Sequence, residues 1–427
     1  MSIKNEDKKV FFVVGAGLLQ LPFIDEIYSN GYIPAVFDMN PEAPAFKKYD
    51  DNKIIKIIVS TKDEEGCLKE AKKISERYKP VAVATVGTDF SRTVAKIGNF
   101  FNLPSNPYEV ALVTTNKGLM RKRLKEKNVS QPNFEVISEF SQLEDAMKRL
   151  GKNYYVLKPV DNMGARGVTL ISKDIAKSIL KNLFDEAIQF SSEKKIIIEE
   201  YIRSFELSID AIVIDGNITI TGVADRFILN PPNFVELGHL MPSILPEDLV
   251  EAGCNVFIEG IKALGIINGA AKGDIRVRYE YEVGKEKVKG KKIAKGYVGE
   301  IASRLSGGFM SAYTFPYSSG INLMNVMMKV ALGEKDIKIE PKWSFYSCEL
   351  GFVSDKEGIL KSIDGSYEAM MVPYIKNVFI MKNPGEKIIK TKNNVTKLAN
   401  VISSAPTATK AIIASKTALS KLKVNLY

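Results

Sequence analysis

The chain has 427 residues, 45% of them hydrophobic and 26% charged, and this composition is typical of a globular protein with two or three domains. No apolar run approaches the roughly 20 residues of a membrane-spanning helix, and the N-terminus does not resemble a signal peptide. The net charge of +10 is compatible with an anionic ligand, and the three widely spaced cysteines, which share no metal-ligand spacing, favour reduced thiols and a cytoplasmic location.

Residues 10–103 alternate short β-branched runs with segments of helical periodicity. The expected strands are Val10–Val14, Ile33–Phe37, Ile54–Val59 and Val81–Thr85. The expected helices are Leu18–Ser29, Glu64–Tyr78 and Ser91–Phe101. Because strands that alternate with helices form a parallel sheet with helices on its faces, this region predicts a Rossmann-like domain.

The first expected strand runs into Gly15-Ala16-Gly17, and the second ends at Asp38. This resembles a dinucleotide-binding fingerprint, but Gln20 stands where the third glycine is required, so NAD binding is not expected. We interpret the turn as a tight strand-to-helix connection whose helix N-terminus can receive an anion.

The pattern changes at Pro132, which follows a helical stretch at residues 108–127. Glycine-rich connections then accompany runs that predict antiparallel strands, namely Tyr154–Leu157, Val168–Ile171, Ile196–Glu199 and Leu207–Ile214. Residues 281–296 are strongly basic and predict an exposed hairpin that joins two further strands.

A third segment begins near Ser344 and predicts a hairpin at Gly351–Asp364, a strand at Val378–Lys382 and a final pair of helices. Residues 382–427 also contain nine lysines and a single acidic residue, Glu386. A nucleic-acid-binding surface is one interpretation, but this segment lacks arginine and has only Tyr427 for base stacking. A solvated lysine-rich helix face is therefore favoured, and neither a nucleic acid nor a membrane is expected as a partner.

Five elements in the middle of the chain contain the residues that can carry chemistry. In order they are a helix with Lys117, YYVLKPVDNMGARGV with Lys158, IIIEEYIRSFELSID with Glu199 and Glu206, a strand with Asp274, and YVGEIASRLSGGF with Glu300 and Arg304. Two lysines from separate elements can hold a triphosphate, and glycines let backbone N–H groups approach phosphates closely. Carboxylates on adjacent strands suit Mg²⁺, which prefers hard oxygen ligands.

This order of motifs resembles the ATP-grasp superfamily, and in particular the branch with biotin carboxylase, carbamoyl-phosphate synthase, purine-pathway ligases and L-amino-acid ligases. The resemblance covers nearly the whole chain and implies an α/β fold in three parts. These are an N-terminal Rossmann-like domain with a parallel sheet (residues 1–106), a central ATP-grasp domain with antiparallel sheets (107–343) and a small C-terminal α+β domain (344–427).

The resemblance also implies a role for each motif. The expected ATP-binding residues are Lys117, Lys158, the loop residues Gly164, Arg166, Gly167 and Val168, the hinge residues Glu199, Glu200, Tyr201 and Ile202, and the ribose ligand Glu206. Mg²⁺ or Mn²⁺ is expected at Asp274 and Glu300. Arg304 and Lys158 are the expected catalytic residues, and Arg304 with the turn Ser306-Gly307-Gly308 is expected to meet the acyl phosphate of the substrate.

The chain differs from the family pattern at three positions. Asp274 replaces the usual glutamate at the metal site, Ala302 replaces the usual asparagine two residues after the second metal carboxylate, and Ala165 replaces a serine in the glycine loop. Metal coordination is therefore the part of the implied site that depends most on the folded structure.

His239, the only histidine, lies in the segment NFVELGHLMPSIL. One interpretation is an imidazole in a loop or in the core. The other is a substrate-binding residue, because this segment resembles a substrate-side loop of amino-acid-ligase-like members of the superfamily. On that reading Glu236 and His239 bind the amino group of the substrate.

The sequence thus predicts an ATP- and Mg²⁺-dependent, ADP-forming ligase that converts a carboxylate into an acyl phosphate and joins it to an amine. The carboxylate is expected on an amino acid or another small metabolite, and a homodimer is the candidate assembly. Two alternatives stay open. One is a carboxylase or carbamoyl-phosphate-synthase-like enzyme that phosphorylates bicarbonate, and the other is a nucleotide-binding regulator without turnover.

Overall fold

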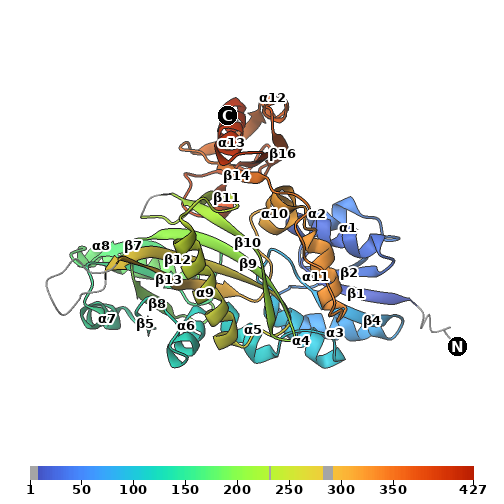
Figure 1. Ribbon diagram of the computed structural model, residues 1–427, viewed down its shortest axis with the longest axis horizontal. Helices are drawn as coiled ribbons and strands as arrows, with labels where there is room; N and C mark the ends of the chain where they lie inside the picture. Colours follow the sequence, from blue (N-terminus) through green and yellow to red (C-terminus); the bar gives the residue numbers. More distant parts are fainter. Residues whose placement is uncertain (1–7, 230–231, 282–291) are drawn as a thin grey trace.

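The computed structural model of the protein describes residues 8–229, 232–281 and 292–427. The chain forms an N-terminal part with a parallel sheet, a central part built on antiparallel sheets and a small C-terminal part that lies at the top of the view (Figure 1). The predicted fold class is confirmed by this architecture. Among the described helices, none combines the length and the apolar character that crossing a membrane requires.

The N-terminal sheet has four parallel strands in the order β3-β2-β1-β4. They are β1 (Lys9–Val14), β2 (Ile33–Asp38), β3 (Ile55–Ile58) and β4 (Lys79–Ala84). The helical segments of this part are η1 (Leu18–Gln20), α1 (Leu21–Ser29), α2 (Pro44–Lys48), α3 (Glu64–Ser75) and α4 (Ser91–Phe101). The central strand β1 is buried from Val10 to Val14, as expected for a parallel strand that is covered on both faces.

Two helices, α5 (Tyr108–Thr115) and α6 (Lys117–Glu126), occupy the region where the sequence predicted one helical stretch. The break falls at Asn116, whose side chain accepts a hydrogen bond of 3.0 Å from the backbone N–H of Leu119 and so caps α6. This cap places Lys117 in the first turn of α6.

A smaller antiparallel sheet follows, with the strand order β5-β8-β6-β7. Its strands are β5 (Phe134–Ile137), β6 (Tyr154–Pro159), β7 (Thr169–Ser172) and β8 (Ile196–Glu200), and its helical segments are η2 (Phe140–Gln142), α7 (Leu143–Leu150) and α8 (Lys177–Gln189). Apolar residues of α7 and α8 pack with those of the sheet in one buried cluster, which leaves the opposite face of the sheet for polar residues.

The largest sheet has eight antiparallel strands in the order β13-β12-β9-β10-β11-β14-β18-β16. They are β9 (Phe205–Ile214), β10 (Asn217–Ile228), β11 (Glu236–Met241), β12 (Gly269–Tyr281), β13 (Lys292–Ala302), β14 (Tyr346–Phe352), β16 (Ile375–Ile380) and β18 (Ala399–Ala405). The helices between them are α9 (Glu247–Leu264), the π-helix η3 (Met310–Thr314), α10 (Phe315–Ser319) and α11 (Leu323–Ala331). Because β11 pairs with β14, the sheet continues across residue 343.

The predicted basic hairpin joins β12 and β13, which pair in antiparallel register. Residues 282–291 of that hairpin lie outside the described part of the chain.

The C-terminal part adds a three-stranded sheet in the order β17-β15-β19. Its remaining elements are β15 (Gly358–Asp364), α12 (Ser366–Met370), β17 (Lys387–Ile388), η4 (Asn394–Thr396), α13 (Ala408–Lys421) and β19 (Lys423–Leu426). The predicted hairpin at Gly351–Asp364 is wrong, because β14 pairs with β11 and β18 whereas β15 pairs with β17 and β19.

The predicted final pair of helices is also wrong. A single helix, α13, lies between the strands β18 and β19. Every residue of β18 is buried, because this strand lies between β14 and β16 inside the large sheet. Its run of small and β-branched residues therefore forms a strand through pairing with distant neighbours.

Candidate active site

Lys117 and Lys158, the lysines expected to bind the triphosphate, point into one region of the central part. The Nζ atom of Lys117 donates a 2.6 Å hydrogen bond to the carbonyl oxygen of Asn162 and lies 3.3 Å from Oε1 of Glu300. Lys158 on β6 has its Nζ atom 2.7 Å from Oε2 of Glu199. Burial lowers the pKa of Lys158, and the Glu199 carboxylate opposes this effect. The structure thus brings together both lysines and two of the predicted carboxylates.

Arg121 is a buried cation of this region that sequence reasoning missed. Its Nε atom donates a 2.7 Å hydrogen bond to Glu199, and its two Nη atoms donate to the carbonyl oxygens of Val298 and Gly299. Burial opposes ionisation of Glu199, but Arg121 and Lys158 outweigh it and hold the pKa of Glu199 at about 2. Glu199 therefore stays ionised and orients Lys158. The cationic run around Arg121 was a signal, but nothing in the sequence showed which of its members is buried.

The loop expected to cover the phosphates lies between β6 and β7. Gly164, Ala165 and Gly167 have φ values of 72°, 58° and 70°, a conformation that glycine adopts without steric cost. Nη2 of Arg166 donates a 2.6 Å hydrogen bond to Oδ1 of Asn162, which ties the loop back to the end of β6. Val168 follows this turn immediately before β7.

Asn394 connects this loop to the predicted substrate strand, and sequence reasoning also missed it. Its backbone N–H donates a 3.2 Å hydrogen bond to the carbonyl oxygen of Gly164. Its side-chain Oδ1 atom accepts a 2.9 Å hydrogen bond from the backbone N–H of Glu236. A residue near the C-terminus thus contacts both the glycine loop and the start of β11.

The hinge residues Glu200, Tyr201 and Ile202 lie where β8 ends. Lys152 lies 2.8 Å from the Glu200 carboxylate, and the backbone N–H of Tyr201 donates a 3.0 Å hydrogen bond to Tyr154. Ile202 is buried. These three hinge residues also line an open, polar pocket of the protein.

Three predicted site carboxylates meet at Arg226 on β10. Its guanidinium nitrogens lie 3.3 Å from Glu206, 2.8 Å from Glu236 and 2.9 Å from Asp274. Burial alone would lower the pKa of Arg226, but the carboxylates of Asp274, Glu236 and Glu206 raise it. The expected ribose, substrate and metal ligands are therefore adjacent in space. No motif had indicated Arg226.

Asp274 and Glu300 are register partners on the neighbouring strands β12 and β13. Mg²⁺ is usually held by one or two carboxylates together with substrate phosphates, and Glu300 beside Lys117 fits that chemistry. Asp274 fits it less directly, because its carboxylate contacts both Arg226 and Lys272. Within the described residues, no group of three histidine, cysteine, aspartate or glutamate side chains is arranged to hold a metal ion. Substrate oxygens would have to complete any coordination sphere.

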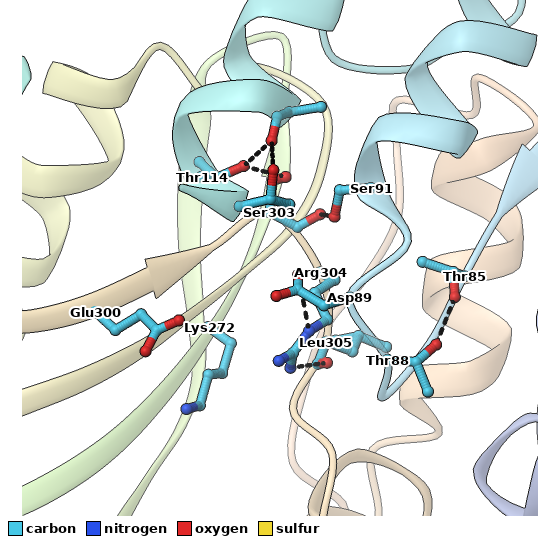
Figure 2. Close-up of polar contacts among 12 residues, drawn as sticks. Thr85, Thr88, Asp89, Ser91, Thr114, Lys272, Glu300, Ser303, Arg304 and Leu305 are labelled. Atoms are coloured by element: carbon cyan, nitrogen blue, oxygen red, sulfur yellow. Dashed lines mark hydrogen bonds and ion pairs between the residues drawn. The ribbon is translucent and has the colours of Figure 1, made fainter. Parts of the chain in front are cut away.

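Arg304 lies at the junction between the central part and the N-terminal part. Its Nε atom is 3.7 Å from Oδ1 of Asp89, and the two side chains face one another beside Glu300 and Lys272 (Figure 2). Burial raises the pKa of Asp89, and the Arg304 charge opposes this effect. Asp89 comes from the loop that joins β4 to α4, so the N-terminal part supplies a charged residue to the site.

The turn Ser306-Gly307-Gly308 is held in place from two sides. The backbone N–H and the hydroxyl of Ser306 both donate to the buried carboxylate of Asp210 on β9. A Cβ atom at Gly307 would lie 2.7 Å from the carbonyl oxygen of Gly87, so only glycine permits this approach to the N-terminal part. Gly308 has a φ of 61°.

His239 is fully buried on β11 and has polar neighbours on both sides of its ring. Its Nε2 atom is 2.9 Å from the hydroxyl of Thr314, and its Nδ1 atom is 3.2 Å from the Glu349 carboxylate. Burial opposes ionisation of Glu236, but Arg226 outweighs it and holds the pKa of Glu236 below its usual range. His239 lies in the interior, which agrees with the interpretation as a core imidazole. It also lies three residues from Glu236 on the same strand, which the interpretation as a substrate-binding residue requires.

Comparisons with known proteins were consistent with this geometry. The ATP-grasp (A) domain of phosphoribosylglycinamide synthetase matches residues 115–227, a range that contains Lys117, Lys158, the glycine loop and residues 199–202. Residues 115–227 of the chain are therefore similar to an ATP-grasp domain. A second match, to L-amino acid ligase C-terminal domain 2, covers residues 351–427. The matched domains are those of ADP-forming, C–N bond-forming ligases, in agreement with the sequence prediction.

Solved structures share this fold over nearly the whole chain. L-amino acid ligase from Bacillus licheniformis has a TM-score of 0.77 and 20% identity, and the match covers 99% of this chain and 100% of that one. Phosphoribosylglycinamide synthetase from Anaerococcus prevotii has a TM-score of 0.72 and 19% identity, with 98% and 100% covered. Among sequence relatives, the uncharacterized protein y4rH from Sinorhizobium fredii is 23% identical over 355 residues, which is 83% of this chain and 70% of that one.

Proposed function

We propose that this ATP-grasp protein is a ligase that phosphorylates a small-molecule carboxylate with ATP and transfers the acyl group to an amine. One observation carries the proposal. Lys117 and Lys158 lie beside Glu199 and Glu300, and the carboxylates Glu206, Glu236 and Asp274 meet at one guanidinium next to them. These contacts support a nucleotide site that adjoins a substrate site.

The substrate class follows from the charges around β11. Glu236 remains ionised. Nδ1 of His239 lies 4.0 Å from the Glu236 carboxylate and 3.2 Å from the Glu349 carboxylate. An ammonium group of the substrate would share the Glu236 carboxylate with Arg226, and opposite charges in a buried site attract strongly. We therefore infer an amino acid as the carboxylate substrate. The match of residues 351–427 to L-amino acid ligase C-terminal domain 2 supports this inference.

In the first step, a carboxylate oxygen attacks the γ-phosphorus, the bond to the ADP oxygen breaks, and ADP leaves with that electron pair. Lys117, Lys158 and Arg304 offset the negative charge of the phosphoryl group while it moves. Mg²⁺, when bound at Glu300 with Asp274 opposite, would supply further positive charge at the phosphate oxygens. An amine then attacks the acyl phosphate, inorganic phosphate leaves, and the amine loses a proton.

The glycine loop excludes water in this scheme, because an acyl phosphate hydrolyses easily when water reaches it. Its contacts with Asn162 and Asn394 hold the loop against the site. Asn394 also accepts a hydrogen bond from Glu236 at the start of β11. In this scheme, closure of the glycine loop over the site therefore depends on the position of β11.

The test is ATP-dependent phosphate release by the full-length chain with a panel of carboxylates, each with and without an amine, and with bicarbonate. We expect release that requires both an amino acid and an amine, with the dipeptide or amide identified by mass spectrometry. Lys158→Ala should lower turnover at least about a hundredfold, because it removes a charge that the transferring phosphate needs. Lys148→Ala, which removes an exposed lysine of α7 that pairs with Asp145, is the matched control and should retain activity.

Other outcomes of the panel contradict the proposal. Phosphate release that requires bicarbonate and no amino acid would favour the carboxylase or carbamoyl-phosphate-forming alternative. Nucleotide binding without release under any condition would favour a regulatory protein.

A further inference from the structure

Lys272 is a charged residue of the site to which no motif and no comparison assigned a role. It lies on β12, where Lys272, Asp274 and Arg276 alternate with the buried residues Ile275 and Val277. Successive side chains of a strand point to opposite faces, so Lys272 shares the face of the predicted metal carboxylate. Its side chain is 15% exposed. Lys272 is therefore directed into the site and away from the core under α9.

The Lys272 ammonium is central to the acidic groups of the site. It contacts the Asp274 carboxylate directly and lies beside Glu300 (Figure 2). Burial opposes ionisation of Glu300, but Lys117, followed by Lys272, outweighs it and holds the pKa of Glu300 at about 2. The same ammonium also favours ionisation of Asp210 and Asp89, whose pKa values burial raises. The charge of Lys272 thus stabilises the ionised form of carboxylates on β9, β13 and the N-terminal part, in addition to its contact with Asp274 on β12.

The space beside Asp274 is shaped for this lysine. Its register partner on β13 is Ala302, and its partner on β9 is Asp210. Ala302 has only a methyl group, and Asp274 is one methylene shorter than glutamate. These are two of the positions at which the sequence departs from the family pattern, and both adjoin Lys272. The two short side chains leave room for a long cationic one between β9 and β13.

Lys272 also changes what can bind at Asp274. The Asp274 carboxylate contacts Lys272 and, at 2.9 Å, Arg226, so two cations already balance its charge. Among the described residues, Glu300 forms one ion pair, with Lys117 at 3.3 Å, and this distance is longer than those from Asp274 to its two cations. A metal ion at Asp274 would have to displace a fixed side-chain charge, whereas one at Glu300 need only share its carboxylate with Lys117.

We propose that Lys272 is a further catalytic residue whose ammonium contacts the γ-phosphoryl group during transfer, in the place beside Asp274 where a second metal ion would otherwise be needed. Asp274 orients the lysine, and Glu300 is the main protein ligand of a single Mg²⁺. The inference rests on the proposed function. The step exchanges one phosphorus–oxygen bond for another and transfers no proton to or from Lys272.

The experiment compares binding of Mg²⁺·ADP with binding of the non-hydrolysable Mg²⁺·β,γ-imido-ATP by calorimetry. In Lys272→Met we expect the imido-ATP affinity to fall about 10- to 100-fold, as for the loss of a hydrogen bond between charged groups. The ADP affinity should change less than about threefold, because ADP lacks the γ-phosphate. Lys335→Met, the same substitution at an exposed lysine that pairs with Asp215, is the matched control and should leave both affinities unchanged. Lys272→Arg should recover part of the imido-ATP affinity.

Equal losses for the two nucleotides, or no loss for either, would refute the role of Lys272 and leave the proposed function intact. A wild-type chain that binds neither nucleotide would instead refute the proposed function, and the role of Lys272 with it. A second measurement does not depend on the variants folding. Wild-type chain saturated with imido-ATP should bind one Mn²⁺ tightly in an electron paramagnetic resonance titration, and two tightly bound Mn²⁺ ions would overturn the proposal.

Discussion

The guanidinium groups of Arg121, which is fully buried, and Arg226, whose side chain is 10% exposed, each contact several acceptors. Arg226 contacts three carboxylates, and Arg121 contacts the Glu199 carboxylate and two backbone carbonyls. Removing one member of such a network leaves a charge in a site with little water, which costs far more than breaking an exposed pair. At the residue scale, these networks are where single substitutions should have their largest effects.

Arg121→Met is expected to lower the free energy of unfolding by about 3–5 kcal/mol, because it leaves Glu199 with only part of its compensation. Arg123→Met is the matched control on the same helix. Arg123 pairs with the exposed Glu109, so its loss should cost less than about 1 kcal/mol. Urea unfolding of both variants at neutral pH measures the difference, and equal effects would show that the buried pair contributes no special stability.

The same pair gives a pH dependence with a definite sign. The pKa of Glu199 is depressed from 4.5 to about 2 in the folded chain, so its stabilising effect is present above pH 4.5 and is lost as the pH falls toward 2. The stability gap between the wild type and Arg121→Met should therefore be largest near neutral pH and shrink below pH 4.5. A gap that grows on acidification would contradict this assignment.

At the scale of elements, the glycine loop between β6 and β7 contacts a segment that is far away in the sequence. Asn394 in η4 reaches Gly164 through its backbone and Glu236 through its side chain. The loop between β6 and β7 is thereby connected to the start of β11 by the C-terminal part, in addition to its own contact between Arg166 and Asn162. Closure of the loop and the position of β11 should therefore depend on one another.

Asn394→Ala is expected to open the glycine loop more often, because it removes the side-chain hydrogen bond to Glu236. The loss of about 1 kcal/mol would raise the open population about fivefold. Trypsin cleavage after Arg166, which lies in the loop, measures this population. Asn383→Ala removes an amide that contacts Glu386 at a separate turn and serves as the control. If cleavage after Arg166 is no faster than in the control, Asn394 does not hold the loop.

For the whole molecule, the large sheet joins the central and C-terminal parts. The strand β11 pairs with β14 through His239 and Leu240, both fully buried, and β14 pairs in turn with β18. The predicted domain limit at residue 343 therefore falls between strands of one sheet. Residues on either side of this limit share a core instead of meeting at a polar interface.

A chain that ends at residue 343 should consequently fail to fold on its own. Its β11 strand would present an unpaired edge with exposed apolar residues, a situation that promotes aggregation. In the full-length chain, the central and C-terminal parts should unfold together in a single urea transition. A truncated chain that is monomeric and unfolds cooperatively would show that residues 344–427 form an independent domain.

Local signals in the sequence were sufficient for the N-terminal sheet and for the principal site residues. The strands from Val10 to Thr85 alternate with helices, and this rhythm depends only on neighbouring residues. Lys117, Lys158, Glu199 and Glu300 stood in recognisable local motifs, and the structure brings them together. Their assigned roles in binding and catalysis remain predictions for the experiments above.

Contacts between distant segments were decided only by the tertiary structure. Residues 399–405 are compatible with a helix or a strand, and burial between β14 and β16 makes them a strand. Arg226, Lys272 and Asn394 look like ordinary polar residues in the sequence, because nothing local records which carboxylates or carbonyls they will face. The sequence by itself therefore determined the fold class and the family motifs, through local periodicity and spacing. The charge network that joins those motifs depended on strand register and on the packing of α6 and η4 against the sheets, since these contacts between distant segments decide which side chains become neighbours.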